Sequence, residues 1–203
     1  MGRKKQILIL AEGFEEKPYL DKILFFPVIS KEYVFKVINV KGCGNIPGRY
    51  QNEYQGGRFE LILVFCDADR EIHDYDEIIK KVGKNFDHPE FANLLFIFAN
   101  PVTLQIVLSH FGKVNLTSIG KSKNAEKVKE LVGIDNYSAK QEQIDTMMSK
   151  VTFKNYQQMK INLSDVSTSI KDVPSTNILQ FLEWFESDDT SWIDNINDKL
   201  SDN

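Results

Sequence analysis

Residues 61–66 constrain the fold most, because this apolar run leads directly into two carboxylates, Asp67 and Asp69. A second short apolar run, residues 7–11, ends in Glu12. Short, β-rich apolar runs with polar or glycine boundaries are typical of strands that are buried on both faces. Such strands belong to parallel sheets, and open α/β sheets bind ligands at the carboxyl ends of their strands. The chain is therefore predicted to gather acids where a ligand would bind.

The alternation of apolar runs and amphipathic segments predicts an α/β fold, a Rossmann-like parallel sheet with helices on both faces. The sheet is expected to have four or five strands, which include residues 6–12, 33–40, 60–66 and 94–98. Between them we expect helices over 14–26 and 74–86, a flexible loop over 41–49, and a helix over 101–111 that Asn100 caps. Helices are also predicted over 123–132, 138–150, 153–160, 177–186 and 190–200. We accordingly expect an α/β domain over residues 1–115 and a helical C-terminal region over 116–203 that packs on it.

Composition narrows the class of protein without naming a partner. The 203 residues carry a net charge of −4, which gives no bulk signal for nucleic acid but leaves room for a local basic patch. Cys43 and Cys66 have neither a metal-type spacing nor a disulfide framework, so a reducing cytoplasm is expected. The first apolar run is too short for a signal peptide or a membrane helix, so no membrane partner is expected.

Three acids form the candidate catalytic and metal site. Asp67 and Asp69 are two residues apart, so on an extended chain their side chains point the same way. Paired hard oxygen ligands suit Mg²⁺ or Mn²⁺, which keep waters for a phosphate to displace. Glu12 is expected nearby, as a third ligand or as the general base. The alternative is that these acids only solvate the ends of the strands.

Substrate contacts are expected from glycine and from basic residues near these acids. Gly13 would let a substrate approach the strand end, and its alternative role is that of a plain turn residue. Lys41 and Arg49 lie in the predicted loop, and Arg70 follows the acids. Further basic candidates are Lys113, Lys121 and Lys123. If these residues converge on one rim, they would supply the phosphate contacts that dominate affinity for nucleic acid.

Two histidines also qualify as candidates. His110 follows Val107 and Leu108 on an apolar face, which favours a buried structural histidine over a catalytic one. His73 follows the acids closely and could shuttle a proton, although a role outside the chemistry is favoured.

The Glu12-Gly13 and Asp67-x-Asp69 pairs resemble the TOPRIM domain, which primases, topoisomerases and OLD-type nucleases share. Residues 7–19 are similar to the opening of RloB-like proteins, a TOPRIM branch found among bacterial defence and restriction-linked genes. The segment that begins at Asn100-Pro101 and includes Leu108, His110 and Phe111 is similar to that family's Asn-Pro segment, and Tyr137 and Lys140 match its layout. The resemblance spans roughly residues 6–160, and it implies a TOPRIM fold and a metal-dependent nuclease with Glu12, Asp67 and Asp69 at its centre.

Two departures from the family pattern concern acids. The family's Asn-Pro segment carries an acid at the position of Leu104, with Gln105 only next to it here. The family's second early acid is also offset, so Glu15 and Glu16 are both candidates for it. These departures leave the predicted triad intact, but they bear on a second metal and on whether the relative is active.

Three functions remain in competition. The first is a metal-dependent nuclease in phage defence, acting on DNA or RNA. The second is a catalytically inactive TOPRIM-like module that binds nucleic acid or a partner ATPase, which the leucine at position 104 favours. The third is a phosphohydrolase or nucleotidyl transferase with an Asp-x-Asp metal site. Haloacid-type phosphatases carry that pair after their first strand, where this chain has Glu12, so the third is disfavoured.

Overall fold

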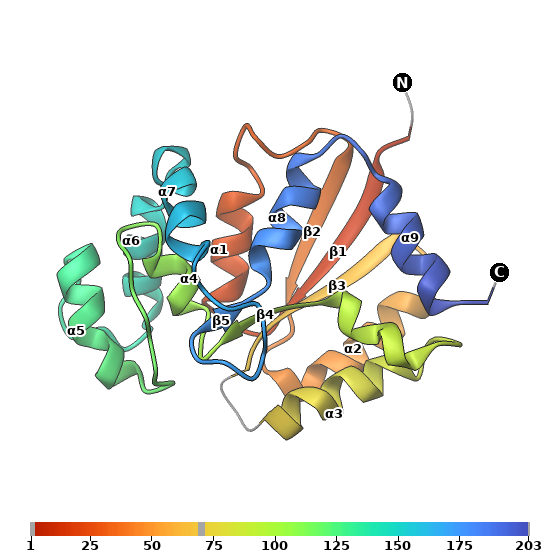
Figure 1. The fold of residues 1–203 in the computed structure, drawn as a ribbon, viewed down its shortest axis with the longest axis horizontal. Coiled ribbons are helices and arrows are strands. Elements are labelled where there is room, and N and C mark those ends of the chain that lie inside the picture. The colour runs from red at the N-terminus through yellow and green to blue at the C-terminus, as the bar shows by residue number, and fades with distance from the viewer. Residues whose placement is uncertain (1–2, 69–71, 203) are drawn as a thin grey trace.

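A five-stranded sheet forms the centre of the molecule, which we describe from a computed structural model covering residues 3–68 and 72–202 (Figure 1). The strand order is β2-β1-β3-β4-β5, and the first four strands are parallel while β5 runs antiparallel to β4. The prediction of an α/β fold with a Rossmann-like parallel sheet is confirmed. The strands are β1 (Lys5–Ala11), β2 (Tyr33–Asn39), β3 (Leu61–Asp67), β4 (Phe96–Asn100) and β5 (Ser175–Thr176).

The apolar runs form the inner strands because both of their faces are covered. The side chains from Ile7 to Ala11 are fully buried, and β3 and β4 are equally apolar. In β1 and β3, Ile7 pairs with Leu61, so that the two strands end side by side. This register brings the residues that follow the two strands to the same edge of the sheet.

Helices cover both faces of this sheet (Figure 1). On one face lie α2 and α3, where the Tyr75 ring of α3 packs against Phe96 and Phe98 of β4. On the other face lie α1 and α8, and Phe185 of α8 packs against Phe35 of β2 with ring centroids 4.8 Å apart. The helices are α1 (Glu16–Ile23), α2 (Ile46–Gln55), α3 (Ile72–Gly83), α4 (Leu104–Leu108), α5 (Lys121–Val132), α6 (Gln141–Lys150), α7 (Phe153–Leu163), α8 (Ile178–Glu186) and α9 (Ser191–Leu200), with short 3₁₀ turns η1 (Cys43–Asn45) and η2 (Pro89–Leu95).

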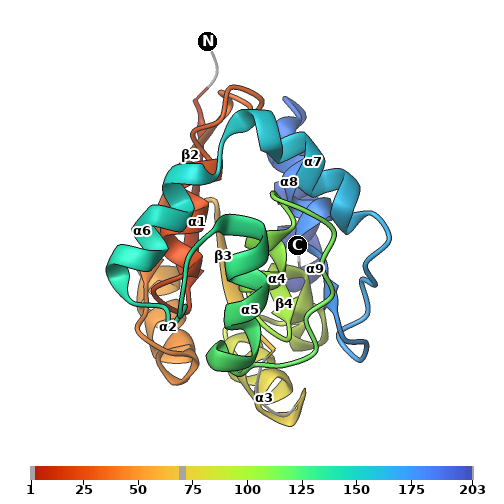
Figure 2. The same ribbon diagram turned by 90° about the vertical axis from the view of Figure 1, so that its left-hand side faces the viewer.

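The helices α4 to α7 gather on one side of the molecule, where α6 packs against α1 and α4 packs against α5 and α7 (Figures 1 and 2). After α7 the chain returns to the sheet and adds β5 beside β4, before α8 and α9. The C-terminal region is therefore not helical throughout, because Ser175 and Thr176 pair with Asn100 and Ala99.

Two local predictions were wrong. The expected loop over residues 41–49 contains η1 and the start of α2, where Pro47 occupies the first helical turn. Asn100 does not cap a helix: it is the last residue of β4, and its side-chain amide donates to the carbonyl oxygens of Ile170 and Asp172 at 2.9 and 3.0 Å. The following helix, α4, begins only at Leu104, so the predicted helix over 101–111 was too long.

Candidate functional site

The strand order reverses between β1 and β3, at a switch point. From β1 the chain continues to β2 on one side of it, and then crosses over to form β3 on the other side. Open α/β sheets bind ligands in the crevice outside the carboxyl ends of the strands at such a point. Glu12 follows β1 directly and Asp67 is the last residue of β3. The predicted pairing of these two strand ends is therefore present.

Hydrogen bonds fix Glu12 against the end of β3. Its backbone N–H donates to the carbonyl oxygen of Phe65 at 2.9 Å, which extends the pairing of the two strands by one residue. The backbone N–H of Asp67 then donates to Oε2 of Glu12 at 3.1 Å. The Glu12 carboxylate thus lies at the end of the neighbouring strand, as the sequence predicts.

Thr103 orients the carboxylate of Asp67. Both the backbone N–H and the hydroxyl of Thr103 donate to Oδ1 of Asp67, at 2.7 and 2.6 Å. Thr103 is fully buried in the turn between β4 and α4. Sequence reasoning missed this residue, and only its place soon after the end of a predicted strand could have indicated it.

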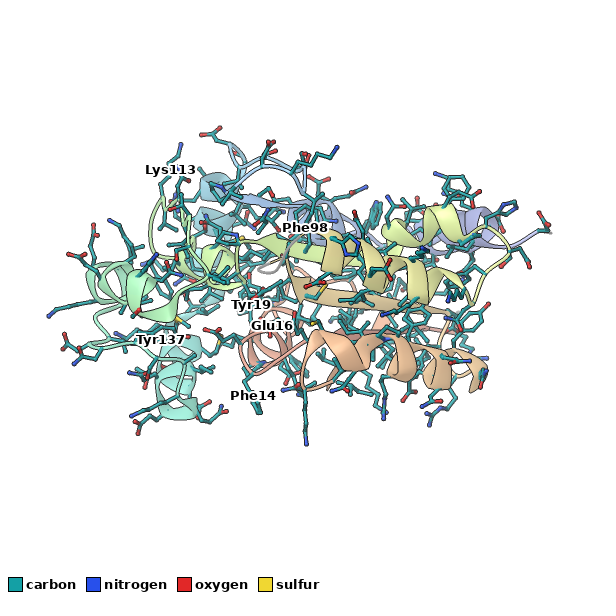
Figure 3. All side chains as sticks on the ribbon, turned by 90° about the horizontal axis from the view of Figure 1, so that it is seen from below. Phe14, Glu16, Tyr19, Phe98, Lys113 and Tyr137 are labelled. Atoms are coloured by element: carbon teal, nitrogen blue, oxygen red, sulfur yellow. The ribbon has the colours of Figure 1, made fainter. Side chains whose placement is uncertain are left out.

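A third described acid, Glu16, is buried in the first turn of α1, with 4% of its surface exposed. Burial, with the charges of Glu15 and Glu12 adding to it, raises the pKa of the Glu16 carboxyl to about 7. Of the two candidates for the second early acid, Glu16 is thus the one that is buried. Figure 3 shows it on α1 near Tyr19.

Gly13 lies close to the buried Glu16 carboxylate, and its predicted role in admitting a substrate stays a prediction. A Cβ atom on Gly13 would lie 2.9 Å from Oε2 of Glu16, closer than such contacts normally come. A side chain here would therefore displace the buried Glu16 carboxylate, whether or not a substrate is present.

These acids line one cavity of about 330 Å³ together with residues of the region that contains α4 to α7. Its apolar lining comes from Phe14, Val102, Leu104, Ile119 and Ala139, and its polar lining from Glu12, Glu15, Glu16, Lys41, Asp67, Asn124 and Tyr137, with Gly13 and Gly42 between them. The Tyr137 hydroxyl donates to the Glu15 carboxylate, so the segment before α6 is tied to the start of α1. The site is thus built jointly by the sheet and by this helical region.

Lys41 reaches the cavity, whereas Arg49 does not line it. Lys41 and Gly42 have positive φ values of 61° and 115°, and the Gly42 backbone N–H donates to the Glu12 carbonyl oxygen at 2.7 Å. This turn brings Lys41 to the cavity wall. Arg49 lies on α2 and pairs instead with the buried Glu53 at 2.7 Å. Asp69 and Arg70, the other predicted site residues, lie outside the described residues.

The two histidines are not part of the cavity lining. His110 is buried between the Tyr19 hydroxyl and the side-chain oxygen of Asn155, each 3.1 Å from a ring nitrogen. Burial lowers the pKa of His110 to about 4, so the ring stays neutral and links α1 to α7. His73 is exposed in the first turn of α3.

Within residues 3–68 and 72–202, no group of three or more histidine, cysteine or acidic side chains is arranged to hold a metal ion. Glu12 and Asp67 nevertheless supply the oxygen donors that Mg²⁺ and Mn²⁺ prefer. Asp69, which is expected to bind the ion together with Asp67, is not among the residues searched. The donor chemistry at this edge of the sheet therefore fits such a cation.

No protein-family model matches the chain, and neither the curated proteins nor the solved structures show a similarity to it. Among the described helices, all are too short or too polar to cross a membrane.

Proposed function

We propose that this chain is a metal-dependent nuclease that hydrolyses phosphodiester bonds in nucleic acid. The observation that carries the proposal is the position of Glu12 and Asp67 at the switch point of the sheet, on the wall of one cavity. Ligands bind at this place in open α/β sheets. The buried Glu16 lines the same cavity as Glu12 and Asp67, so the cavity wall is rich in acidic residues.

An acidic cavity repels a phosphate unless a cation is present, and this supports a divalent metal as cofactor. Glu12, Asp67 and Asp69 would hold Mg²⁺ or Mn²⁺. When bound, such an ion polarises the scissile phosphate and stabilises the leaving oxygen. Two arguments support this choice of metal and ligands: the oxygen donors at the site, and the resemblance to TOPRIM domains.

The chain's own residues would position the reacting groups. The two hydrogen bonds from Thr103 hold one oxygen of Asp67 in place, and the Asp67 N–H holds one oxygen of Glu12. Glu12 serves as a third metal ligand or as the general base that takes a proton from the attacking water. Lys41 on the cavity wall can contact a phosphate of the substrate.

The resemblance to RloB-like proteins supports a cellular context as well. It suggests a cytoplasmic enzyme of phage defence or of a restriction-linked system, with DNA or RNA as substrate and a partner ATPase as a further interaction.

A second candidate is a catalytically inactive module that binds nucleic acid or a partner ATPase. Leu104 favours it, because this side chain forms part of the cavity wall where the family has an acid. Binding without cleavage would distinguish this module from the nuclease.

The test is a cleavage assay with single-stranded DNA, double-stranded DNA and tRNA, in Mn²⁺, Mg²⁺ or EDTA. We expect cleavage that requires the metal and that falls by about 100-fold to 10,000-fold in Glu12→Gln, the range for loss of a positioned acid or base. The matched control is Glu142→Gln on α6, an exposed glutamate that is not part of the cavity lining. Equal cleavage by Glu12→Gln and wild type would reject the nuclease. Metal-independent, salt-sensitive binding with no cleavage would favour the inactive module.

A further inference from the structure

The cavity beside the acids has an apolar side that the chemistry of hydrolysis does not use. Phe14, in the turn between β1 and α1, is 61% exposed, and Ile119, in the segment before α5, is 53% exposed. Both side chains line the same cavity as Glu12 and Asp67, although they are more than 100 residues apart in sequence. Figure 3 shows Phe14 beyond Glu16, towards the surface.

An exposed aromatic ring at a cavity mouth suits a planar ligand. Nucleobases stack on such rings without regard to their identity, because every base has a π face. Leu104 and Val102 also contribute to the apolar lining of the cavity. Leu104, which stands where the RloB-like family has an acid, therefore presents an apolar surface to a ligand. Asn124 also lines the cavity, and its buried amide donates to the Ser118 carbonyl oxygen at 2.8 Å, which holds the segment that carries Ile119 against α5.

Charge also argues for recognition through the base. The described lining contains the carboxylates of Glu12, Glu15, Glu16 and Asp67 and the ammonium group of Lys41. Phosphate contacts alone would therefore bind poorly at this cavity. Apolar contact with an uncharged base avoids the repulsion between phosphate and carboxylates. It would hold the strand while a cation neutralises the carboxylates of the cavity.

Size restricts the form of the nucleic acid. A cavity of about 330 Å³ lies at the lower end of the range for small-molecule sites. A base that remains stacked inside a duplex cannot enter such a cavity, whereas an unpaired or extruded nucleotide can.

We propose that Phe14 is a stacking platform for an unpaired base, so that the chain binds a single strand, with one nucleotide in the cavity next to Glu12 and Asp67. This proposal deepens the proposed function and rests on it for the scissile phosphate. Stacking itself needs no cleavage and can be measured separately.

The test is binding of a fluorescent single-stranded DNA oligonucleotide in Ca²⁺, with a gel to show that the strand stays intact. Three further ligands are compared with it: the same sequence as a duplex, a strand of the same length without bases, and a free mononucleotide as competitor. The variants are Phe14→Ala, Phe14→Trp and, as matched control, Phe25→Ala, whose ring is 87% exposed away from the cavity.

We expect the wild type to bind the single strand at least tenfold more tightly than the duplex or the strand without bases. Phe14→Ala should lose about tenfold on the intact strand, within the range measured for base stacking on aromatic rings, and nothing on the strand without bases. Phe14→Trp and Phe25→Ala should bind as the wild type does. Because Phe14 is exposed, its loss should leave the fold intact, which circular dichroism verifies.

Equal affinity of Phe14→Ala and wild type for the single strand overturns the proposal, as does equal affinity for strands with and without bases. Phe14-dependent binding of the mononucleotide but not of the strand overturns it as well. The two proposals fail separately: Glu12-dependent cleavage with no effect of Phe14 leaves the nuclease standing, and Phe14-dependent binding with no Glu12-dependent cleavage leaves only the binding platform.

Discussion

The two ends of the same sheet are built in opposite ways. At the amino ends of β1 and β2, polar groups meet complementary partners: Lys5 pairs with Asp194 at 3.2 Å, and the Trp192 indole N–H donates to the Tyr33 hydroxyl at 2.9 Å. Trp192 also stacks on Trp184, with ring planes inclined by 10°. At the carboxyl ends, Glu12, Asp67 and the buried Glu16 gather like charges around a cavity.

The two ends of the sheet are expected to contribute differently to the stability of the fold. Complementary groups and stacked rings lower the free energy of the folded state, whereas like charges at a buried site raise it. A fold retains an arrangement that costs stability when a ligand or a reaction requires it. Mutations at the two ends should accordingly change different measured quantities.

The largest stability effect is expected at the amino end, in Trp192→Ala. This change removes a buried ring, its stacking on Trp184 and its hydrogen bond to Tyr33. We expect a loss of about 3–5 kcal/mol in the free energy of unfolding, as for other buried Trp→Ala changes. Denaturant unfolding measures it, with Phe25→Ala as the control that changes little. A loss below about 1 kcal/mol would contradict the role assigned to this end.

A smaller, pH-dependent effect is expected at the carboxyl end, from Glu16. Its pKa is about 7 in the folded chain against 4.5 for the free side chain, so the folded state holds a proton that the unfolded state has lost between these values. The wild type should therefore lose stability as pH rises from about 4.5 to 7, by roughly 2 kcal/mol between pH 5 and pH 8.

Glu16→Gln should remove this loss, because glutamine does not titrate. Its stability relative to the wild type should rise from pH 5 to pH 8, as measured by urea unfolding at both values. Glu142→Gln on α6 serves as the control and should keep the wild-type pH dependence. An identical pH dependence in Glu16→Gln and wild type would show that Glu16 is not the buried acid of this end.

The sequence predicts an element well when the residues of that element alone determine its structure. The apolar runs place β1 to β4 within about two residues, because burial on both faces demands such runs. The helix α2 was missed because its start contains Pro47 and Gly48, which favour a loop in isolation. The strand β5 consists of Ser175 and Thr176, and only the neighbouring edge of β4 makes them a strand.

The site shows the same limit. Glu12 and Asp67 are predictable because each follows an apolar run, and the parallel register brings them together. Thr103 and Phe14 are not, because their part depends on which side chains the fold brings near them. The close approach of Gly13 to Glu16 was likewise not predictable, since this carboxylate becomes buried only in the folded chain.

The claim that the carboxyl end is a metal site is tested most directly by calorimetric titration with Mn²⁺. We predict that the wild type binds the ion, that Asp67→Asn weakens binding at least tenfold, and that Asp145→Asn, an exposed aspartate on α6, binds as the wild type does. Equal binding heats from the wild type and Asp67→Asn would contradict the claim.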